Sequence, residues 1–249
     1  MRFAIVMTYF ERYEQLKNTL KSITQYKDTR VTIVDDCSPS GIPISHLLLA
    51  NRIYGRIISP QKKTWTSNCI PFNMGFEAAL EDNPDIVIIQ NAECYHAGDI
   101  VGYAEKHLTD DNYISFGCYS LPKDSPIPPP VLWPVGASFD GEGAWYNHPI
   151  HRAVGYHFCS AITAKNLRKL NGFDERFAYG LAYEDNMFLH QVRNLGLKIE
   201  ITAEPYVFHQ WHYENKHNDP FLIKKNADLF SDLKQSNDYR AIHIITPDL

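Results

Sequence analysis

Short apolar runs alternate with amphipathic stretches along the first half of the chain. The apolar runs have the length of buried strands and occupy residues 3–7, 31–34, 55–58 and 86–89. Apolar positions at helical spacing predict helices over residues 14–26, 44–51, 73–80 and 98–108. Strands that alternate with helices favour a mostly parallel α/β sheet whose two faces are covered by helices.

Polar residues directly follow three of these strands. They are Thr8-Tyr9 after the first, Asp35-Asp36 after the second and Asn91-Ala92-Glu93 after the fourth. In parallel sheets ligands bind beyond the carboxyl ends of the strands, so we expect the chemistry in these loops. Asp35-Asp36 is equally compatible with a simple turn. Neither a dinucleotide-binding glycine pattern nor a P-loop occurs in the chain.

The second half contains a glycine-bounded turn, residues 172–177, followed by the adjacent acids Glu184 and Asp185. Apolar residues at helical spacing begin directly after the pair and end at Gly196, a residue typical of helix C-caps. The positive field of a helix N-terminus stabilises acids there. The pair is therefore either a cap on a solvated turn or a site where one acid serves as a catalytic base.

The remaining second half is less regular. Residues 121–151 are rich in proline and glycine but too aromatic for simple disorder. We interpret them as a loop over the active site that lines an acceptor pocket through Trp145 and His148; a proline-rich cover packed on the sheet is the alternative. Strands are expected at 155–162 and 205–208, helices at 165–170 and 221–233, and a final strand or an extended tail at 239–246.

Composition narrows the class of protein. With 249 residues the chain is long enough for one large domain with an ample core. A net charge of −5 argues against a nucleic-acid partner held through its phosphates. Five cysteines without a Cys-x-x-Cys pair suit free thiols in a reducing compartment. Because no signal-peptide or transmembrane pattern occurs, we expect a cytoplasmic protein, for which peripheral membrane contact stays possible.

Taken in order, these motifs resemble the GT-A-fold, family 2-like glycosyltransferases. The nucleotide-binding half of that family is similar to three motifs here: Thr8-Tyr9-Phe10-Glu11-Arg12, Val34-Asp35-Asp36-Cys37-Ser38 and Asn73-Met74-Gly75. Gly172-Phe173-Asp174-Glu175 with Glu184-Asp185 resembles the acceptor-side motif of galactosyltransferase-type and polypeptide N-acetylgalactosaminyltransferase-type enzymes. The resemblance runs from about residue 2 to residue 212, most of the chain.

The resemblance implies a single-domain GT-A fold, a Rossmann-like, mostly parallel central sheet flanked by helices. Its domain would span residues 1–212, with a nucleotide-sugar-binding half at 1–118 and an acceptor and catalytic half at 119–212. Residues 213–249 would then form a C-terminal helical extension.

The resemblance also implies roles for individual residues. Asp185 matches the general base that deprotonates the acceptor hydroxyl, and Glu184 matches its partner that holds or orients substrate. Asp36 matches the aspartate that pairs with the uracil or ribose of a UDP-sugar. The full set of positions implied for nucleotide binding is Thr8, Tyr9, Glu11, Arg12, Asp36, Asn73 and Asn91.

Asn91-Ala92-Glu93 falls where the family has its Asp-x-Asp metal motif. Glu93 is then the metal-ligating position, and the amide of Asn91 retains the ability to bind ribose. His209 matches a histidine that some members use as a further ligand, while His212 is the alternative. Mixed oxygen and nitrogen ligands suit Mn²⁺ somewhat better than Mg²⁺, although one carboxylate fewer is expected to weaken metal affinity.

Three functions follow, in descending order. The first is an inverting, metal-assisted glycosyltransferase that moves a hexose or N-acetylhexosamine from a UDP-sugar to a hydroxyl of a glycan or glycoconjugate. The second is a catalytically inactive homologue that binds a nucleotide sugar or a glycan, which the amide at Asn91 favours. The third, a nucleotidyltransferase, is disfavoured because its glycine-rich, basic loop is missing after the first strand.

Overall fold

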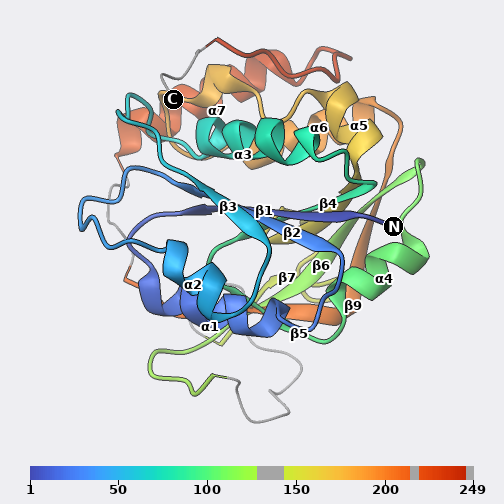
Figure 1. Ribbon diagram of the computed structural model, residues 1–249. Helices are drawn as coiled ribbons and strands as arrows, with labels where there is room; N and C mark the ends of the chain where they lie inside the picture. The colour runs from blue at the N-terminus through green and yellow to red at the C-terminus, as the bar shows by residue number, and fades with distance from the viewer. Residues whose placement is uncertain (128–142, 214–218, 245–249) are drawn as a thin grey trace.

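One mixed sheet forms the centre of the molecule. The computed structural model describes residues 1–127, 143–213 and 219–244, whose arrangement is shown in Figure 1. Within them the strands follow the order β3-β2-β1-β4-β8-β6-β9-β5, with β7 paired to β6. The strands are β1 (Phe3–Tyr9), β2 (Thr29–Asp35), β3 (Gly55–Ile58), β4 (Ile86–Asn91), β5 (Cys94–Ala97), β6 (Asn112–Ser120), β7 (Trp145–Asn147), β8 (Cys159–Thr163) and β9 (Lys198–His209).

Half of the strand pairings are parallel, and the three longest ladders are among them. β1 pairs in parallel with both β2 and β4, β2 pairs in parallel with β3, and β6 with β9. β8 lies antiparallel between β4 and β6, while β5 and β7 add antiparallel edges. The predicted α/β class, with a mostly parallel sheet in one domain, is therefore confirmed.

Helices cover both faces of the sheet (Figure 1). The helices are α1 (Tyr13–Ile23), α2 (Ser45–Ala50), α3 (Cys69–Glu81), α4 (Ile100–His107), α5 (Ala164–Leu170), α6 (Glu184–Asn194) and α7 (Pro220–Leu233), with a short 3-10 turn, η1, at Glu175–Phe177. Side chains of β1 alternate between two cores, because successive strand residues point to opposite faces. Ile5 and Met7 pack in the core with α1, α2 and α4, while Ala4 and Val6 pack with α3, α5 and α6.

Close packing of α3 on the sheet depends on Gly75. A Cβ at this position would lie 2.6 Å from Cγ1 of Val6 on β1 and 3.2 Å from Cγ2 of Val34 on β2. The glycine therefore lets the helix approach β1 and β2, whose carboxyl ends carry the predicted polar loops.

The structure corrects the strand prediction for the part of the chain that follows β4. β5, β6 and β7 were not expected, and β9 begins at Lys198 rather than at residue 205. The pairing of β9 with β6 is shifted between Phe116 and Gly117, which pair with Thr202 and Tyr206. Pro205 lies in this bulge, where the missing N–H of a proline does no harm to the ladder. The bulge interrupts the alternating pattern, so only the last part of the strand is visible in the sequence.

The segment predicted as an active-site loop, residues 121–151, is only partly described. Residues 128–142 lie outside the described residues. In the part that follows, Trp145–Asn147 forms β7 and pairs with β6 through Cys118 and Tyr119. This end of the segment is therefore a sheet edge.

The C-terminal part of the chain returns to the turn at 172–177. Of the predicted final strand or tail, residues 239–244 form neither a strand nor a helix, and residues 245 and 246 lie outside the described part. The backbone N–H of Ala241 donates to the carbonyl of Leu170 (2.7 Å), and that of Glu175 donates to the carbonyl of Ile242 (2.9 Å). The tail is thus fastened to the chain that precedes η1.

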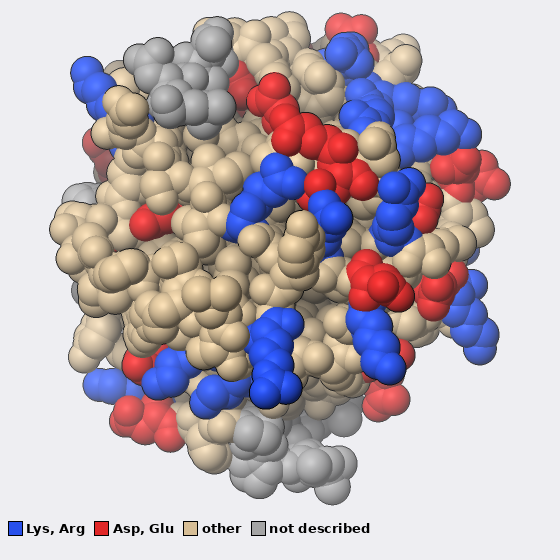
Figure 2. All heavy atoms as spheres, in the orientation of Figure 1, with Lys and Arg blue, Asp and Glu red and all other residues tan. Residues whose placement is uncertain are grey.

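Charged side chains of both signs share the surface. On the face shown in Figure 2, basic and acidic side chains lie interspersed rather than in separate fields. Several form exposed ion pairs, such as Lys17 with Glu14 and Lys165 with Asp110. Among the described helices, none has both the length and the apolar character that crossing a membrane requires.

Candidate active site

The carboxyl ends of β1 and β2 form one wall of a cavity of about 670 Å³. Five residues predicted to bind the nucleotide line this cavity: Thr8, Tyr9, Glu11, Arg12 and Asp36. The loop before α6 contributes Leu181 and Ala182, and α7 contributes Ile223. The first-half loops and the approach to the Glu184-Asp185 pair therefore border the same space.

Asp36 is held in place by two donors. Its Oδ1 accepts a hydrogen bond from Nε1 of Trp65 at 2.7 Å, and its Oδ2 pairs with Nζ of Lys63 at 2.5 Å. Burial raises the pKa of the Asp36 carboxyl, although Lys63 and Trp65 act in the opposite direction. The result is a fixed acceptor beside a cation, an arrangement that suits the edge of a base or a ribose hydroxyl.

The structure does not bring Asn91 and Asn73 into the lining of this cavity. Asn91 ends β4 opposite Thr8, and its backbone N–H donates to the carbonyl of Phe158. Asn73 lies within α3, where its Nδ2 donates to the carbonyl of Phe173 and to Oε1 of Glu175, both at 2.9 Å. Nucleotide binding by these two residues stays a prediction.

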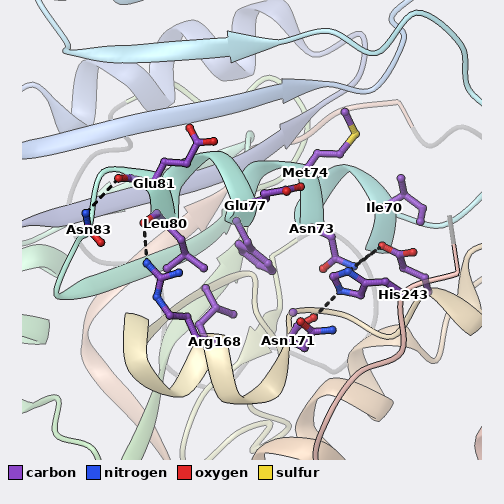
Figure 3. Close-up of a pocket in the computed structure, with 14 residues that line it drawn as sticks. Ile70, Asn73, Met74, Glu77, Leu80, Glu81, Asn83, Arg168, Asn171 and His243 are labelled. Atoms are coloured by element: carbon purple, nitrogen blue, oxygen red, sulfur yellow. Dashed lines mark hydrogen bonds and ion pairs between the residues drawn. The ribbon is translucent and has the colours of Figure 1, made fainter. Parts of the chain in front are cut away.

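Asn73 instead lines a second cavity, of about 760 Å³, between α3 and α5. Figure 3 shows Asn73 on α3 facing Asn171 and His243 across this space. Nε2 of His243 lies 2.6 Å from the carbonyl oxygen of Asn171, so the C-terminal tail closes one end. The contacts of Asn73 therefore connect α3 with the 172–177 turn, and Glu175 of that turn bonds the tail.

Glu93, His209 and His212 form a compact cluster. One potential ligand atom from each lies within 4.8 Å of the others. Oε1 of Glu93 is 3.1 Å from Nε2 of His209 and 3.8 Å from Nε2 of His212. The antiparallel register of β5 and β9 places Cys94, the neighbour of Glu93, opposite His209. Both histidines considered in the sequence thus reach the predicted metal-ligating acid.

Gln210 fixes the backbone around this cluster. It is 3% exposed, and its Nε2 donates to the carbonyl of Glu93 at 3.0 Å and to Oγ1 of Thr19 at 3.0 Å. Its own backbone N–H also donates to the Glu93 carbonyl, at 3.1 Å. The turn that carries Glu93 and the end of β9 are therefore held together by paired hydrogen bonds, and α1 joins them.

Arg12 provides a positive charge beside the Glu93 carboxylate. Its guanidinium pairs with Oε1 of Glu93 at 2.5 Å, and the same arginine lines the cavity of Asp36. Burial opposes ionisation of Glu93, but Arg12 and His209 outweigh it and hold the pKa of this carboxyl well below its usual range. Glu93 is consequently a carboxylate at neutral pH, the form that ligates metal.

The cluster fits a divalent cation. Oε2 of Glu93 is buried and has no hydrogen-bond partner in the described structure, so one strong oxygen ligand is uncommitted. Burial and the charge of Arg12 lower the pKa of His212, which favours the neutral imidazole that a metal requires. One carboxylate with two imidazoles is a donor set for Mn²⁺ or a later transition metal rather than for Mg²⁺.

Glu184 and Asp185 open α6 as predicted, and His157 meets them from the chain before β8. Nδ1 of His157 pairs with Oδ1 of Asp185, while the imidazole packs edge-on against Phe72 and Phe173. Burial, reinforced by the charge of Asp185, raises the pKa of Glu184 to about 7. Of the two acids, Asp185 is thus the one in direct contact with a histidine, and Glu184 is partly protonated at neutral pH.

Trp145 and His148 lie next to each other at β7, with ring centroids 4.4 Å apart. Burial lowers the pKa of His148, whose Nδ1 accepts the backbone N–H of Ile150. Between them in sequence, the ring of Tyr146 lies 5.1 Å from that of His209. β7 therefore borders the Glu93 cluster through Tyr146, while acceptor contacts by Trp145 and His148 stay a prediction.

Several site residues carried no signal in the sequence. Lys63 and Trp65 lie in a loop without a recognisable motif, and His157 precedes a strand far from the acid it contacts. Tyr146 lies in the proline- and glycine-rich segment, where its aromatic character was the only indication. The part these residues play in the site can be recognised only in the folded structure, where the sheet brings distant loops together.

The strand order, the crossing helices and the strand-end loops together define the GT-A glycosyltransferase fold. Solved structures with that fold match this chain over most of its length. Neither a protein-family model nor a curated protein matches the sequence.

The matching structures include TarS of S. aureus and glucosyl-3-phosphoglycerate synthase of M. tuberculosis. TarS 1–349 in complex with UDP shares 13% identity at a TM-score of 0.60, covering 95% of this chain and 74% of that one. The synthase in complex with Mn²⁺, UDP and glucosyl-3-phosphoglycerate shares 11% identity at a TM-score of 0.54, covering 92% and 79%. Against a longer TarS structure, this chain covers 37% of the length. The likeness is one of fold.

Proposed function

We propose that this protein is an inverting glycosyltransferase that moves a sugar from a UDP-sugar to an acceptor hydroxyl, assisted by a divalent metal. The observation that carries the proposal is the cluster of Glu93, His209 and His212, joined through Arg12 to the cavity of Asp36. TarS has been solved with UDP-GlcNAc and with UDP, and the mycobacterial synthase with UDP and Mn²⁺, which supports a UDP-sugar donor.

In this proposal the first-half loops bind the donor. Thr8, Tyr9 and Asp36 face the nucleoside, with Lys63 beside the Asp36 carboxylate. Arg12 lies between the nucleotide cavity and Glu93, where its charge offsets that of a diphosphate leaving group. Glu93, His209 and His212 would hold the metal, which when bound supplies further positive charge for the leaving diphosphate.

Asp185 is the proposed general base. Its Oδ1 is paired with His157, and with 31% of its side chain exposed the residue remains accessible to an acceptor. An inverting transfer requires one base on the face opposite the leaving group and no second carboxylate nucleophile. Glu184, whose pKa is raised to about 7, is able to donate a hydrogen bond and is proposed to hold substrate.

The acceptor is proposed to be a glycan or glycoconjugate that approaches past β7, where Trp145 and His148 lie. The donor sugar is proposed to be a hexose or an N-acetylhexosamine. Five free thiols, four of them buried, suit a reducing compartment, so we place the enzyme in the cytoplasm.

The test is UDP release from a panel of UDP-sugars, with and without Mn²⁺, measured after metal removal by a chelator. We expect turnover of at least one donor and its loss on chelation. Asp185→Asn is the matched variant, because it keeps the size of the side chain and removes its basicity. Undiminished turnover in that variant would remove Asp185 from the role of base.

A second candidate function has its own observation. Asn91 stands where a second carboxylate is expected, and Arg12 already neutralises Glu93, so the chain is also compatible with a binding protein without turnover. Calorimetry separates the two. UDP affinity that is independent of Mn²⁺, with no turnover over the donor panel, favours the binding protein.

A further inference from the structure

Helix α7 holds the loop that leads into the Glu184-Asp185 pair. Asn226 of α7 is completely buried, at 0% exposure. Its Nδ2 donates hydrogen bonds to the carbonyl oxygens of Phe177, at 3.2 Å, and of Ala182, at 2.8 Å. One side chain thus clamps both ends of the loop between η1 and α6.

The loop is shaped around this side chain. A Cβ on Gly180 would lie 2.1 Å from Oδ1 and 2.8 Å from Nδ2 of Asn226, so a larger residue there would displace the amide. The backbone N–H of Leu181 donates to the carbonyl of Leu222 on α7, at 3.2 Å. The ring of Tyr183 lies 5.9 Å from that of Phe230 on the same helix.

The conformation of the loop requires such support. Ala182 and Tyr183 have φ angles of +61° and +68°, in the left-handed region that residues with a side chain rarely adopt. Consecutive residues of this kind persist only where their surroundings impose them. Asn226 bonds the carbonyl of the first, and Phe230 packs against the second. Tyr183 is also the N-cap of α6, so it sets the direction in which Glu184 and Asp185 leave the loop.

We propose that Asn226 is a positioning residue for the catalytic base: through the carbonyls of Phe177 and Ala182 it fixes the start of α6 and hence the place of Asp185. The catalytic part of this proposal, in which Asp185 is the base, rests on the proposed function. The proposal assigns α7, which lies beyond residues 2–212 that carry the sequence resemblance, a part in the active site. Gly180 belongs to the same arrangement, because the Asn226 amide occupies the space that a Cβ at this position would need.

The experiment compares three variants with one control. Asn226→Asp keeps the size but removes both donor hydrogens, Asn226→Leu keeps the volume without polarity, and Gly180→Ala leaves Asn226 intact but pushes it away. Asp228→Asn is the control, because it breaks an exposed ion pair with Lys224 on the same helix. The readouts are kcat for UDP release, the dissociation constant for UDP by calorimetry, and deuterium exchange of backbone amides at 178–186.

We expect kcat to fall about tenfold to 100-fold in all three variants, because displacing a base by about an ångström has that effect. UDP affinity is expected to stay within about threefold, since Asp36 and Lys63 are untouched. Amide exchange at 178–186 is expected to accelerate in the variants and not in Asp228→Asn. A merely structural role for Asn226 would lower the melting temperature and leave kcat of the folded variants unchanged.

Folded variants with the kcat and exchange of the wild type would overturn the proposal. If the Asn226 variants do not fold, the Gly180→Ala variant and amide exchange of the wild type test the proposal instead. An unprotected Leu181 amide in the wild type would also overturn the proposal. A wild type that binds UDP but turns over no donor refutes the proposed function instead. In that case unchanged exchange in the variants refutes the positioning role, and accelerated exchange supports it.

Discussion

Two clusters in the candidate active site pair a carboxylate with histidine, and they are built in opposite ways. Glu93 lies in the turn between β4 and β5, fixed by backbone hydrogen bonds and by the buried amide of Gln210. Asp185 follows two left-handed residues and depends on packing from α7. The Glu93 cluster is therefore fixed by the strands of the sheet, whereas the position of Asp185 depends on contacts with α7.

The difference has a physical meaning for function. A metal site has to keep ligand distances within a few tenths of an ångström, and strand ends in a paired sheet provide that rigidity. A loop in sparsely populated backbone regions stores strain, which persists only while its surroundings hold it. We therefore expect variants at the Glu93 cluster to affect metal affinity, and variants at the Asp185 cluster to affect turnover.

The largest expected effect is at Asp185. Asp185→Asn removes the basic oxygen and is expected to lower kcat for UDP release by about 1,000-fold, the contribution of a positioned general base. UDP affinity should stay unchanged, because the nucleotide cavity keeps its own residues. Parallel kinetics and calorimetry on one protein preparation make the measurement. A large loss of UDP affinity would contradict the separation of the two clusters.

Removal of the proposed metal-ligating acid, Glu93, comes next. Glu93→Gln deletes the only carboxylate of the cluster and is expected to weaken Mn²⁺ binding by about 100-fold, with His212→Ala weakening it by about tenfold. Electron paramagnetic resonance of free Mn²⁺ reports this directly, without any need for turnover. Equal Mn²⁺ affinity in the wild type and in Glu93→Gln would move the metal site elsewhere.

The third prediction concerns pH and stability at Glu184. Its pKa is about 7 in the folded protein against 4.5 as the ordinary value, so the folded state retains a proton that the unfolded chain releases. This contribution to stability is complete below about pH 4.5 and is lost as the pH rises towards 7 and beyond. Glu184→Gln, which cannot ionise, should gain about 2 kcal/mol in unfolding free energy relative to the wild type between pH 5 and pH 8.

Urea unfolding at both pH values measures this difference. A constant gap between the two proteins at pH 5 and pH 8 would show that the Glu184 carboxyl ionises normally. Glu200→Gln, a replacement on β9 away from both clusters, serves as the reference for the general effect of removing one negative charge.

The smallest expected effect is at Trp145. Trp145→Phe keeps the packing against His148 and Tyr206 but reduces the aromatic surface offered to a sugar. We expect KM for the acceptor to rise about fivefold, with the donor KM and metal affinity unchanged. Initial-rate kinetics at varied acceptor concentration make the measurement. An equal change in donor KM would indicate that β7 serves the Glu93 cluster through Tyr146 instead.

The fold up to the end of β4 was predictable because its pattern is local. Strands buried on both faces give uninterrupted apolar runs, and the amphipathic helices between them keep a helical period. β6 and the first part of β9 were not predicted, for two different reasons. β6 is buried throughout although it contains polar residues such as Asn112 and Ser115, and β9 is interrupted by the bulge at Pro205. Such features reflect pairing partners that lie far away in sequence.

The candidate site was predictable to the extent that a motif carried it. Glu93 and His209 were expected together, and the structure brings them within 3.1 Å. Both His209 and His212 reach Glu93, so which of them ligates a metal stays a prediction. His157, Lys63 and Asn226 were inaccessible to sequence reasoning. Each acts on a residue many positions away, and its chemistry is ordinary outside that contact.

The hydrogen bonds of Asn73 have a consequence for how the chain folds as it is made. They tie α3 to Phe173 and Glu175, 100 and 102 residues later, and Glu175 in turn binds the backbone of Ile244, another 69 residues on. Some packing partners of Phe72 and Phe76 on the apolar face of α3 are therefore synthesised long after the helix itself. Contacts closed over such separations form slowly. Until residues 173–244 have been synthesised, this part of the α3 surface lacks its partners, and exposed apolar surface of this kind favours aggregation.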